Sequence, residues 1–172
     1  EKLVFLSNEA KILYIKYVVE LSSELIKSKN YKGSIDLLEY GISLFYESVF
    51  TDQLIIISCK YIEEAEYNLS ITLLNKLVSK HPDAEPLLAK CFLNLSLQEK
   101  SNDSRKVLLL KAFEFKNNHN KVFNDKLYES IFREVVSNII EVAYKYGEFS
   151  YYSDSYTLLD LVLLHEPASL NA

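Results

Sequence analysis

The feature that most constrains the fold of this chain is a pattern that returns after 36 residues. Segment 30–35 (NYKGSI) aligns with segment 66–71 (EYNLSI). Upstream of it, Val18, Leu21, Ser22 and Leu25 match Leu54, Ile57, Ser58 and Tyr61, and downstream Leu38 matches Leu74. The spacing i, i+3, i+4 and i+7 places each upstream set on one face of an α-helix. Because the serines leave room for a crossing helix, the pattern predicts pairs of amphipathic helices folded back on each other.

A third copy of the pattern lies near the end of the chain. Its first-helix face is Ile139, Val142, Ala143 and Tyr146, and its second-helix face is Ser155, Leu159 and Val162. Pro167 is expected to end this copy as Pro82 ends its own, since proline lacks an amide hydrogen and disfavours helical geometry in the residue before it. Three copies in order predict an all-α chain.

The repeat resembles the tetratricopeptide repeat (TPR) family, whose repeat is about 34 residues long. It departs from the family pattern in having no Trp and in using Ser where Ala or Gly is usual. The resemblance implies a TPR-like α-solenoid of about eight helices in antiparallel pairs. It also implies that residues 1–172 form a single helical-repeat domain.

The apolar periodicity and the turn signals divide the chain into eight expected helices, at about 8–28, 31–47, 51–65, 67–80, 84–99, 104–116, 123–146 and 152–165. Ser7 or Asn8 is the expected N-cap of the first helix, and Thr51 or Asp52 that of the third. Gly147 can supply a left-handed C-cap for the seventh. The hairpin 84–116 lacks a small residue at the expected crossing and is interpreted as a degenerate repeat.

Composition excludes several classes of protein. With only three Gly and three Pro in 172 residues, the chain is a poor candidate for an all-β fold with many tight turns. A net charge of −5 argues against a general nucleic-acid binder. No uninterrupted apolar run reaches the length of about 18 residues that a membrane span needs. Cys59 and Cys91 lie within apolar helical patterns, which is typical of reduced, buried thiols in an intracellular protein.

Both ends of the chain are apolar, in segments 3–6 and 158–164. Because the outer faces of a solenoid need a cover, each end is expected to meet further solenoid or a partner. The chain begins at Glu1 and contains no Met, which we interpret as a segment of a longer solenoid.

No catalytic, cofactor or metal site is predicted. His81, His119 and His165 have no spacing to Cys, Asp or Glu that suits zinc, and His81 and His165 are expected to interact with helix-end carbonyls. The acidic run at 63–66 is interpreted as a solvated face. The mildly basic region, for which an acidic peptide or a phosphate backbone is the alternative to a solvated helix, comprises Arg105, Lys106, Lys111, Lys116, His119 and Lys121.

The candidate recognition site is an aromatic cluster near the C-terminus. It consists of Tyr144, Tyr146, Phe149, Tyr151, Tyr152 and Tyr156. Aromatic rings with a polar tip are common anchors of protein interfaces, so a partner-binding role is predicted. The alternative is that several of these rings pack inside the last hairpin. The predicted function is a non-enzymatic protein–protein scaffold with no cofactor and no small-molecule substrate.

A narrower resemblance concerns two segments. Leu73–Leu95 (LLNKLVSKHPDAEPLLAKCFLNL) is similar to a helix–Pro–acidic–helix passage of the meiotic TPR scaffold family, which supplies the TPR subunit of the synapsis-initiation complex. Tyr156–Leu170 (YTLLDLVLLHEPASL) is similar to that family's Leu-rich terminal helix. This resemblance implies a nuclear protein that joins crossover factors to the chromosome axis and promotes synaptonemal complex assembly. The alternative is a cytoplasmic TPR adaptor or peptide-recognition module of a trafficking, chaperone or ubiquitin-ligase assembly.

Overall fold

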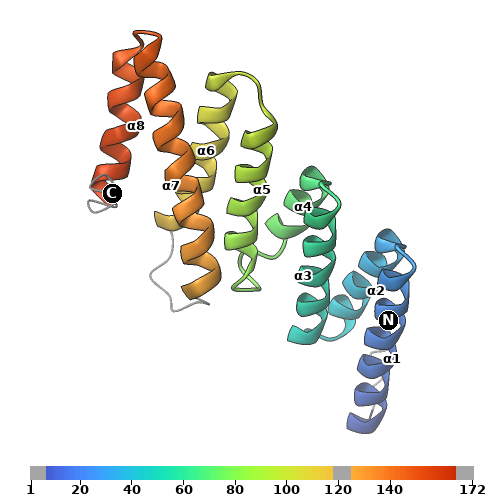
Figure 1. The fold of residues 1–172 in the computed structure, drawn as a ribbon. Helices are drawn as coiled ribbons and strands as arrows, with labels where there is room; N and C mark the ends of the chain where they lie inside the picture. Colours follow the sequence, from blue (N-terminus) through green and yellow to red (C-terminus); the bar gives the residue numbers. More distant parts are fainter. Residues whose placement is uncertain (1–6, 118–124, 166–172) are drawn as a thin grey trace. The chain divides into compact units, whose positions relative to one another are not determined.

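The computed structural model describes residues 7–117 and 125–165, and within them the secondary structure is helical with no strand (Figure 1). The helices are α1 (Asn8–Lys27), α2 (Tyr31–Leu44), α3 (Ser48–Glu63), α4 (Tyr67–Asn75), α5 (Ala84–Gln98), α6 (Asn102–Asn117), α7 (Asp125–Glu148) and α8 (Tyr152–His165). This confirms the all-α prediction and its eight helices. The predictions for segment 3–6, His119, Lys121 and Pro167 lie outside the described residues, as do the side chains of Lys116 and His165.

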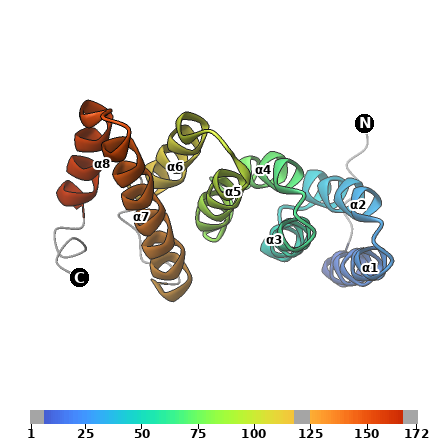
Figure 2. The ribbon, with the colours of Figure 1, turned by 45° about the horizontal axis from the view of Figure 1, so that its top comes forward.

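The chain divides into two compact units, Glu1–His81 with α1–α4 and Pro82–Ala172 with α5–α8. Each unit consists of two antiparallel helical hairpins (Figure 2). In each unit, successive helices are neighbours, and the first helices of the two hairpins also contact each other, α1 with α3 and α5 with α7. Hairpins therefore pack side by side within each unit. That residues 1–172 form one repeat domain stays a prediction.

The serines of the repeat lie where the two helices of each N-terminal hairpin cross. Ser22 and Ser34 are fully buried, and their Oγ atoms are 2.7 Å apart between α1 and α2. In the next hairpin, the Ser70 hydroxyl donates to the carbonyl of Ser58 over 3.1 Å, and both residues are again fully buried. Small side chains let the helix axes approach, and the hydroxyls find partners inside the crossing. The crossing predicted from the sequence is confirmed in both hairpins.

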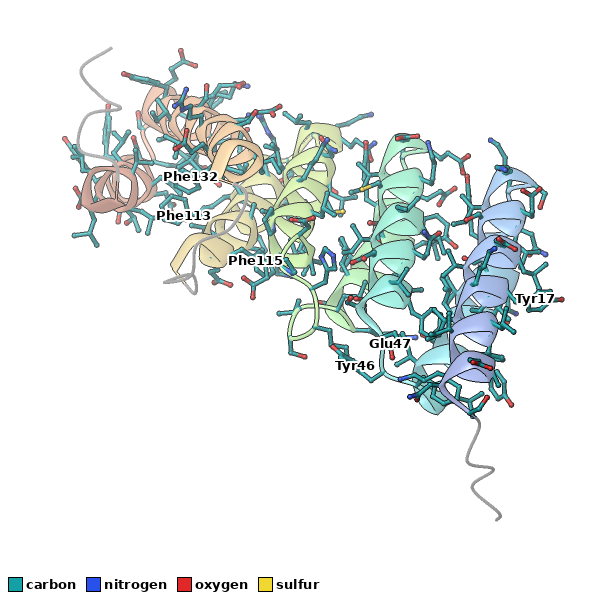
Figure 3. The ribbon with its side chains drawn as sticks, turned by 90° about the horizontal axis from the view of Figure 1, so that it is seen from below. Tyr17, Tyr46, Glu47, Phe113, Phe115 and Phe132 are labelled. Carbon is teal, nitrogen blue, oxygen red and sulfur yellow. The ribbon has the colours of Figure 1, made fainter. Side chains whose placement is uncertain are left out.

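The C-terminal unit reaches the same arrangement with other small residues. Ala143 of α7 is fully buried, and a Cβ placed on Gly147 would lie 3.7 Å from the Oγ of the half-buried Ser155 in α8. The α5–α6 hairpin, predicted to be degenerate, packs into the common core of its unit with Ala89 and Ala112 buried. Aliphatic side chains and aromatic rings fill the rest of that core, and in Figure 3 Phe113 and Phe132 lie beside each other, with ring centroids 5.3 Å apart.

One backbone motif recurs at the turn of three hairpins. Lys29, Ala65 and Ser150 adopt left-handed φ values of 59°, 61° and 64°. In each turn, the amide of this residue donates to the carbonyl three residues back, and the next amide donates to the carbonyl five residues back, over 2.8–3.1 Å. This is the Schellman arrangement, in which a left-handed residue satisfies the last carbonyls of a helix. The three residues occupy the same position in the aligned repeats. The repeat is therefore visible in the backbone conformation as well as in the pattern of side chains.

The prediction that Gly147 caps α7 is wrong, because α7 continues to Glu148 and Ser150 takes the left-handed conformation. The prediction that α3 is capped by Thr51 or Asp52 is also wrong. Helix α3 begins at Ser48 because the fully buried Phe50 lies in its first turn. Thr51, also buried, donates to the Ser48 carbonyl over 2.7 Å inside the helix.

Two other helix-end predictions have different outcomes. Ser7 accepts a hydrogen bond from the Ala10 amide over 3.2 Å and is the N-cap of α1, as predicted. Helix α4 ends at Asn75 rather than near residue 80, because the chain tightens into turns in which the amides of Leu77 and Lys80 donate three residues back.

Candidate functional site

The predicted aromatic cluster separates into an exposed set and one buried ring. The exposed rings, here called the aromatic surface, are Tyr144 (65% exposed), Phe149 (67%), Tyr151 (61%), Tyr152 (58%) and Tyr156 (67%). Tyr146, predicted with them, is instead only 5% exposed. The chain therefore holds five large rings in solvent at the α7–α8 end, while Tyr146 supports them from inside.

Tyr146 ties α7 to the first turn of α6 and to Tyr151, the residue before α8. Its hydroxyl donates to Asp103 over 2.5 Å, and its ring meets the Tyr151 ring edge-on at 6.2 Å between centroids. The Lys106 ammonium lies 5.6 Å from the centre of the Tyr146 ring and pairs with Asp154. Burial raises the pKa of Tyr146 strongly, and the hydrogen bond to Asp103 and the negative charges of both aspartates raise it further. The phenol therefore stays protonated and acts as a structural donor.

A hollow of about 330 Å³ opens beside this network. Its lining comprises Asn102, Asp103, Tyr146, Phe149, Tyr151 and Asp154. Two carboxylates and three aromatic rings suit a hydrogen-bond donor or a cation. The lining contains no thiol and no hydroxyl–histidine pair.

The outer face of α8 is in the same register as a covered face of α2. In α2 the positions are Tyr31, Ile35, Leu38 and Ile42, and in α8 they are Tyr152, Tyr156, Leu159 and Leu163. Tyr31 is 8% exposed because it packs edge-on against Tyr61 of α3, with centroids 5.2 Å apart, and its hydroxyl donates to Glu64 over 3.0 Å. The equivalent Tyr152 has no such cover among the described residues. Sequence analysis missed this relation, although aligning the second helices of the repeat would have revealed it.

A matching face is open on α1. Leu21 was predicted to lie inside the fold, yet it is 36% exposed, whereas its repeat equivalents Ile57 and Val142 are fully buried. Helices α3 and α7 each pack against the first helix of the preceding hairpin, α1 and α5 respectively. Among the described residues, no preceding hairpin packs against α1 in the same way. Leu13 and Tyr17, two turns and one turn before Leu21, are 67% and 62% exposed. Figure 3 shows Tyr17 on the side of α1 that faces away from α3.

The three described members of the basic region, Arg105, Lys106 and Lys111, are engaged within their own unit. Arg105 is 9% exposed and lies 3.6 Å from a carboxylate oxygen of Glu141. Lys106 pairs with Asp154, and the Lys111 ammonium lies 5.7 Å from the centre of the Phe92 ring. These contacts leave Arg105 and Lys106 poorly placed for a phosphate backbone or an acidic peptide.

The acidic run is also more than a solvated face, because Glu64 joins two hairpins. It accepts from Lys29 over 2.7 Å and from Tyr31 over 3.0 Å. The hydrogen bond from Lys29 contributes most, and that from Tyr31 next, to lowering the pKa of Glu64. His81, predicted to bind helix-end carbonyls, has its Nε2 3.1 Å from a carboxylate oxygen of Asp52.

The described residues contain no group of three or more His, Cys, Asp and Glu side chains placed to hold a metal ion. A membrane span would need a longer and more apolar helix than any in the part of the chain described here. Comparison of the chain with protein-family models, with curated proteins and with solved structures gives no match.

Proposed function

We propose that the chain is a non-enzymatic protein-interaction module that binds a partner through the aromatic surface. The observation that carries this proposal is the exposure of five aromatic rings, each between 58% and 67%, at one end of the C-terminal unit. Apolar rings left in water are unfavourable, and contiguous exposed apolar area marks interaction sites. Tyrosine is especially suited to such a site because its ring supplies area and its hydroxyl supplies a hydrogen bond.

The support beneath these rings favours the same function. Tyr146, Asp103 and Lys106 hold the α7–α8 turn by a hydrogen bond, a ring contact and an ion pair. A rigid support reduces the conformational entropy that binding has to overcome. The polar atoms that line the adjoining hollow can orient a partner beside the apolar rings.

Site-specific photo-crosslinking tests the proposal. Benzoylphenylalanine replaces Phe149 or Tyr156 of the aromatic surface, and a control chain carries it at Leu97, an exposed position (50%) of the same unit. We expect discrete adducts from positions 149 and 156 in cells that express the chain, and none from position 97. Equal adduct patterns at all three positions would show that the aromatic surface is not a binding site.

The partner found in this way separates the two narrower proposals. A component of the meiotic chromosome axis or a crossover factor supports the nuclear scaffold that the sequence resemblance implies. A trafficking, chaperone or ubiquitin-ligase component supports the alternative, a TPR adaptor.

A further inference from the structure

The contact between α2 and α3 shows how one hairpin of this chain receives the next. Tyr31 and Leu38 of α2 are 8% and 0% exposed, with Ile35 and Ile42 half-buried on the same face. On the other side, α3 buries Ile57 completely and presents Tyr61 to the Tyr31 ring. The joint therefore needs one apolar stripe from a second helix of the repeat and one from a first helix.

The described residues hold an uncovered copy of each stripe. The tail face, on α8, consists of Tyr152, Tyr156, Leu159 and Leu163, the equivalents of Tyr31, Ile35, Leu38 and Ile42. The head face, on α1, consists of Leu13, Tyr17 and Leu21, the equivalents of Val49, Gln53 and Ile57 of α3. Of these seven side chains, Leu159 is half-buried and the other six are between 36% and 67% exposed. One half of the α2–α3 joint is thus open on α8 and the other half is open on α1.

We infer that a second copy of this chain is the occupant, and that the tail face of one copy binds the head face of the next. The inference rests on the proposed function in that the aromatic surface binds protein, and it names the partner. The two open faces are complementary because both keep the register of the α2–α3 joint and both consist of aliphatic or aromatic side chains. Because the two faces differ, the contact is head-to-tail, and an open assembly of any length retains one free head face and one free tail face.

A head-to-tail contact has a consequence that a two-fold dimer lacks. Blocking either face on every copy removes the contact, whereas mixing a head-blocked chain with a tail-blocked chain restores one contact. Tyr17→Lys blocks the head face and Tyr156→Lys blocks the tail face. Both side chains are more than 60% exposed, so each variant should keep the fold. Tyr40→Lys, at an α2 residue that is 59% exposed and lies outside both faces, is the matched control.

Sedimentation velocity on the whole chain tests the inference between micromolar and millimolar concentrations. We expect the average mass of the wild type and of Tyr40→Lys to rise with concentration beyond that of a dimer. Tyr17→Lys and Tyr156→Lys alone should each associate at least tenfold more weakly. Their equimolar mixture should form a heterodimer and nothing larger. Circular dichroism confirms that every variant remains helical.

Three results would overturn the inference. They are a wild type that stays monomeric throughout, a variant pair in which only one substitution weakens association, and a mixture that forms no heterodimer. The second result would indicate a symmetric dimer through one face. A monomeric wild type that still gives adducts from Phe149 to another protein would overturn this inference alone and leave the proposed function standing. If the wild type is monomeric and the aromatic surface gives no specific adducts, both this inference and the proposed function are overturned.

Discussion

At the scale of single residues, the least expected feature of this chain is that residues other than glycine occupy its left-handed turns. Lys29, Ala65 and Ser150 all have φ near +60°. A Cβ in this conformation lies close to the following carbonyl oxygen and costs roughly 1–2 kcal/mol. The two hydrogen bonds of each turn offset part of this cost by satisfying the end of the preceding helix.

Ala65→Gly should therefore stabilise the protein. Removing the Cβ relieves the strain, while the greater freedom of glycine in the unfolded chain takes back part of the gain. We expect the free energy of unfolding in urea to rise by about 0.5–1 kcal/mol. The same substitution at Ala10, inside α1, should instead lower it by up to about 1 kcal/mol. A loss of stability at both positions would contradict the strained-turn explanation.

Tyr146 makes a second residue-level prediction, which concerns pH. The folded protein raises the pKa of this phenol above its ordinary value, chiefly by burial. The stabilisation is therefore fully present below a pH of about 10, where the unfolded chain also keeps the proton, and it is lost as the pH rises through the folded-state pKa. Tyr146→Phe should cost about 1 kcal/mol at neutral pH, because it removes the hydrogen bond to Asp103.

The measurement is urea unfolding at pH 7 and at several values from pH 9 to 11. The difference in the free energy of unfolding between wild type and Tyr146→Phe should be constant up to pH 9 and should shrink above pH 10. Tyr156→Phe, which alters an exposed ring of α8, should show no such difference. If the difference in the free energy of unfolding between wild type and Tyr146→Phe does not decrease above pH 10, the folded protein does not raise the pKa of Tyr146.

At the scale of helices, the serine crossings set how closely paired helices approach. Ser70 is completely buried, and its hydroxyl donates to the Ser58 carbonyl. Ser70→Leu must force α3 and α4 apart and should cost about 1–3 kcal/mol or more. Ser70→Ala keeps the volume small, so it should cost no more than about 1 kcal/mol. Thermal and urea unfolding check both, with Thr72→Leu on the exposed side of α4 expected to change stability by less than about 0.5 kcal/mol.

The sequence was sufficient for the helices and their crossings because both depend on local periodicity. It was insufficient for deciding which apolar faces are covered. Leu21 and Ile57 occupy the same position in the repeat. Only Ile57, however, lies on a helix that packs against a preceding hairpin among the described residues, and only Ile57 is buried. Similarly, Tyr146 was grouped with its exposed neighbours, because its partner Asp103 lies 43 positions away in the sequence. Burial by distant elements cannot be read from a local pattern.

At the scale of the whole molecule, the two compact units raise the question of how far the chain folds as one. Each unit has its own buried side chains, such as Leu38, Phe50 and Leu74 in the first and Phe113, Ile139 and Leu158 in the second. In repeat architectures, stability is approximately a sum of the intrinsic terms of each repeat and its contacts with nearest neighbours. A local loss of packing should therefore register first in its own unit.

Ile57→Ala tests this with hydrogen exchange. Ile57 of α3 is completely buried, so its truncation should remove about 2–5 kcal/mol of local stability. Amides in α1–α4 should exchange faster by the corresponding factor, while amides in α5–α8 keep the rates of the wild type. Ile139→Ala, in the C-terminal core, should give the reverse pattern. Equal acceleration in both units by either substitution would show one cooperative domain over residues 1–172, as the repeat pattern alone predicts. Separate responses would mean that the aromatic surface depends for its stability on α5–α8 alone.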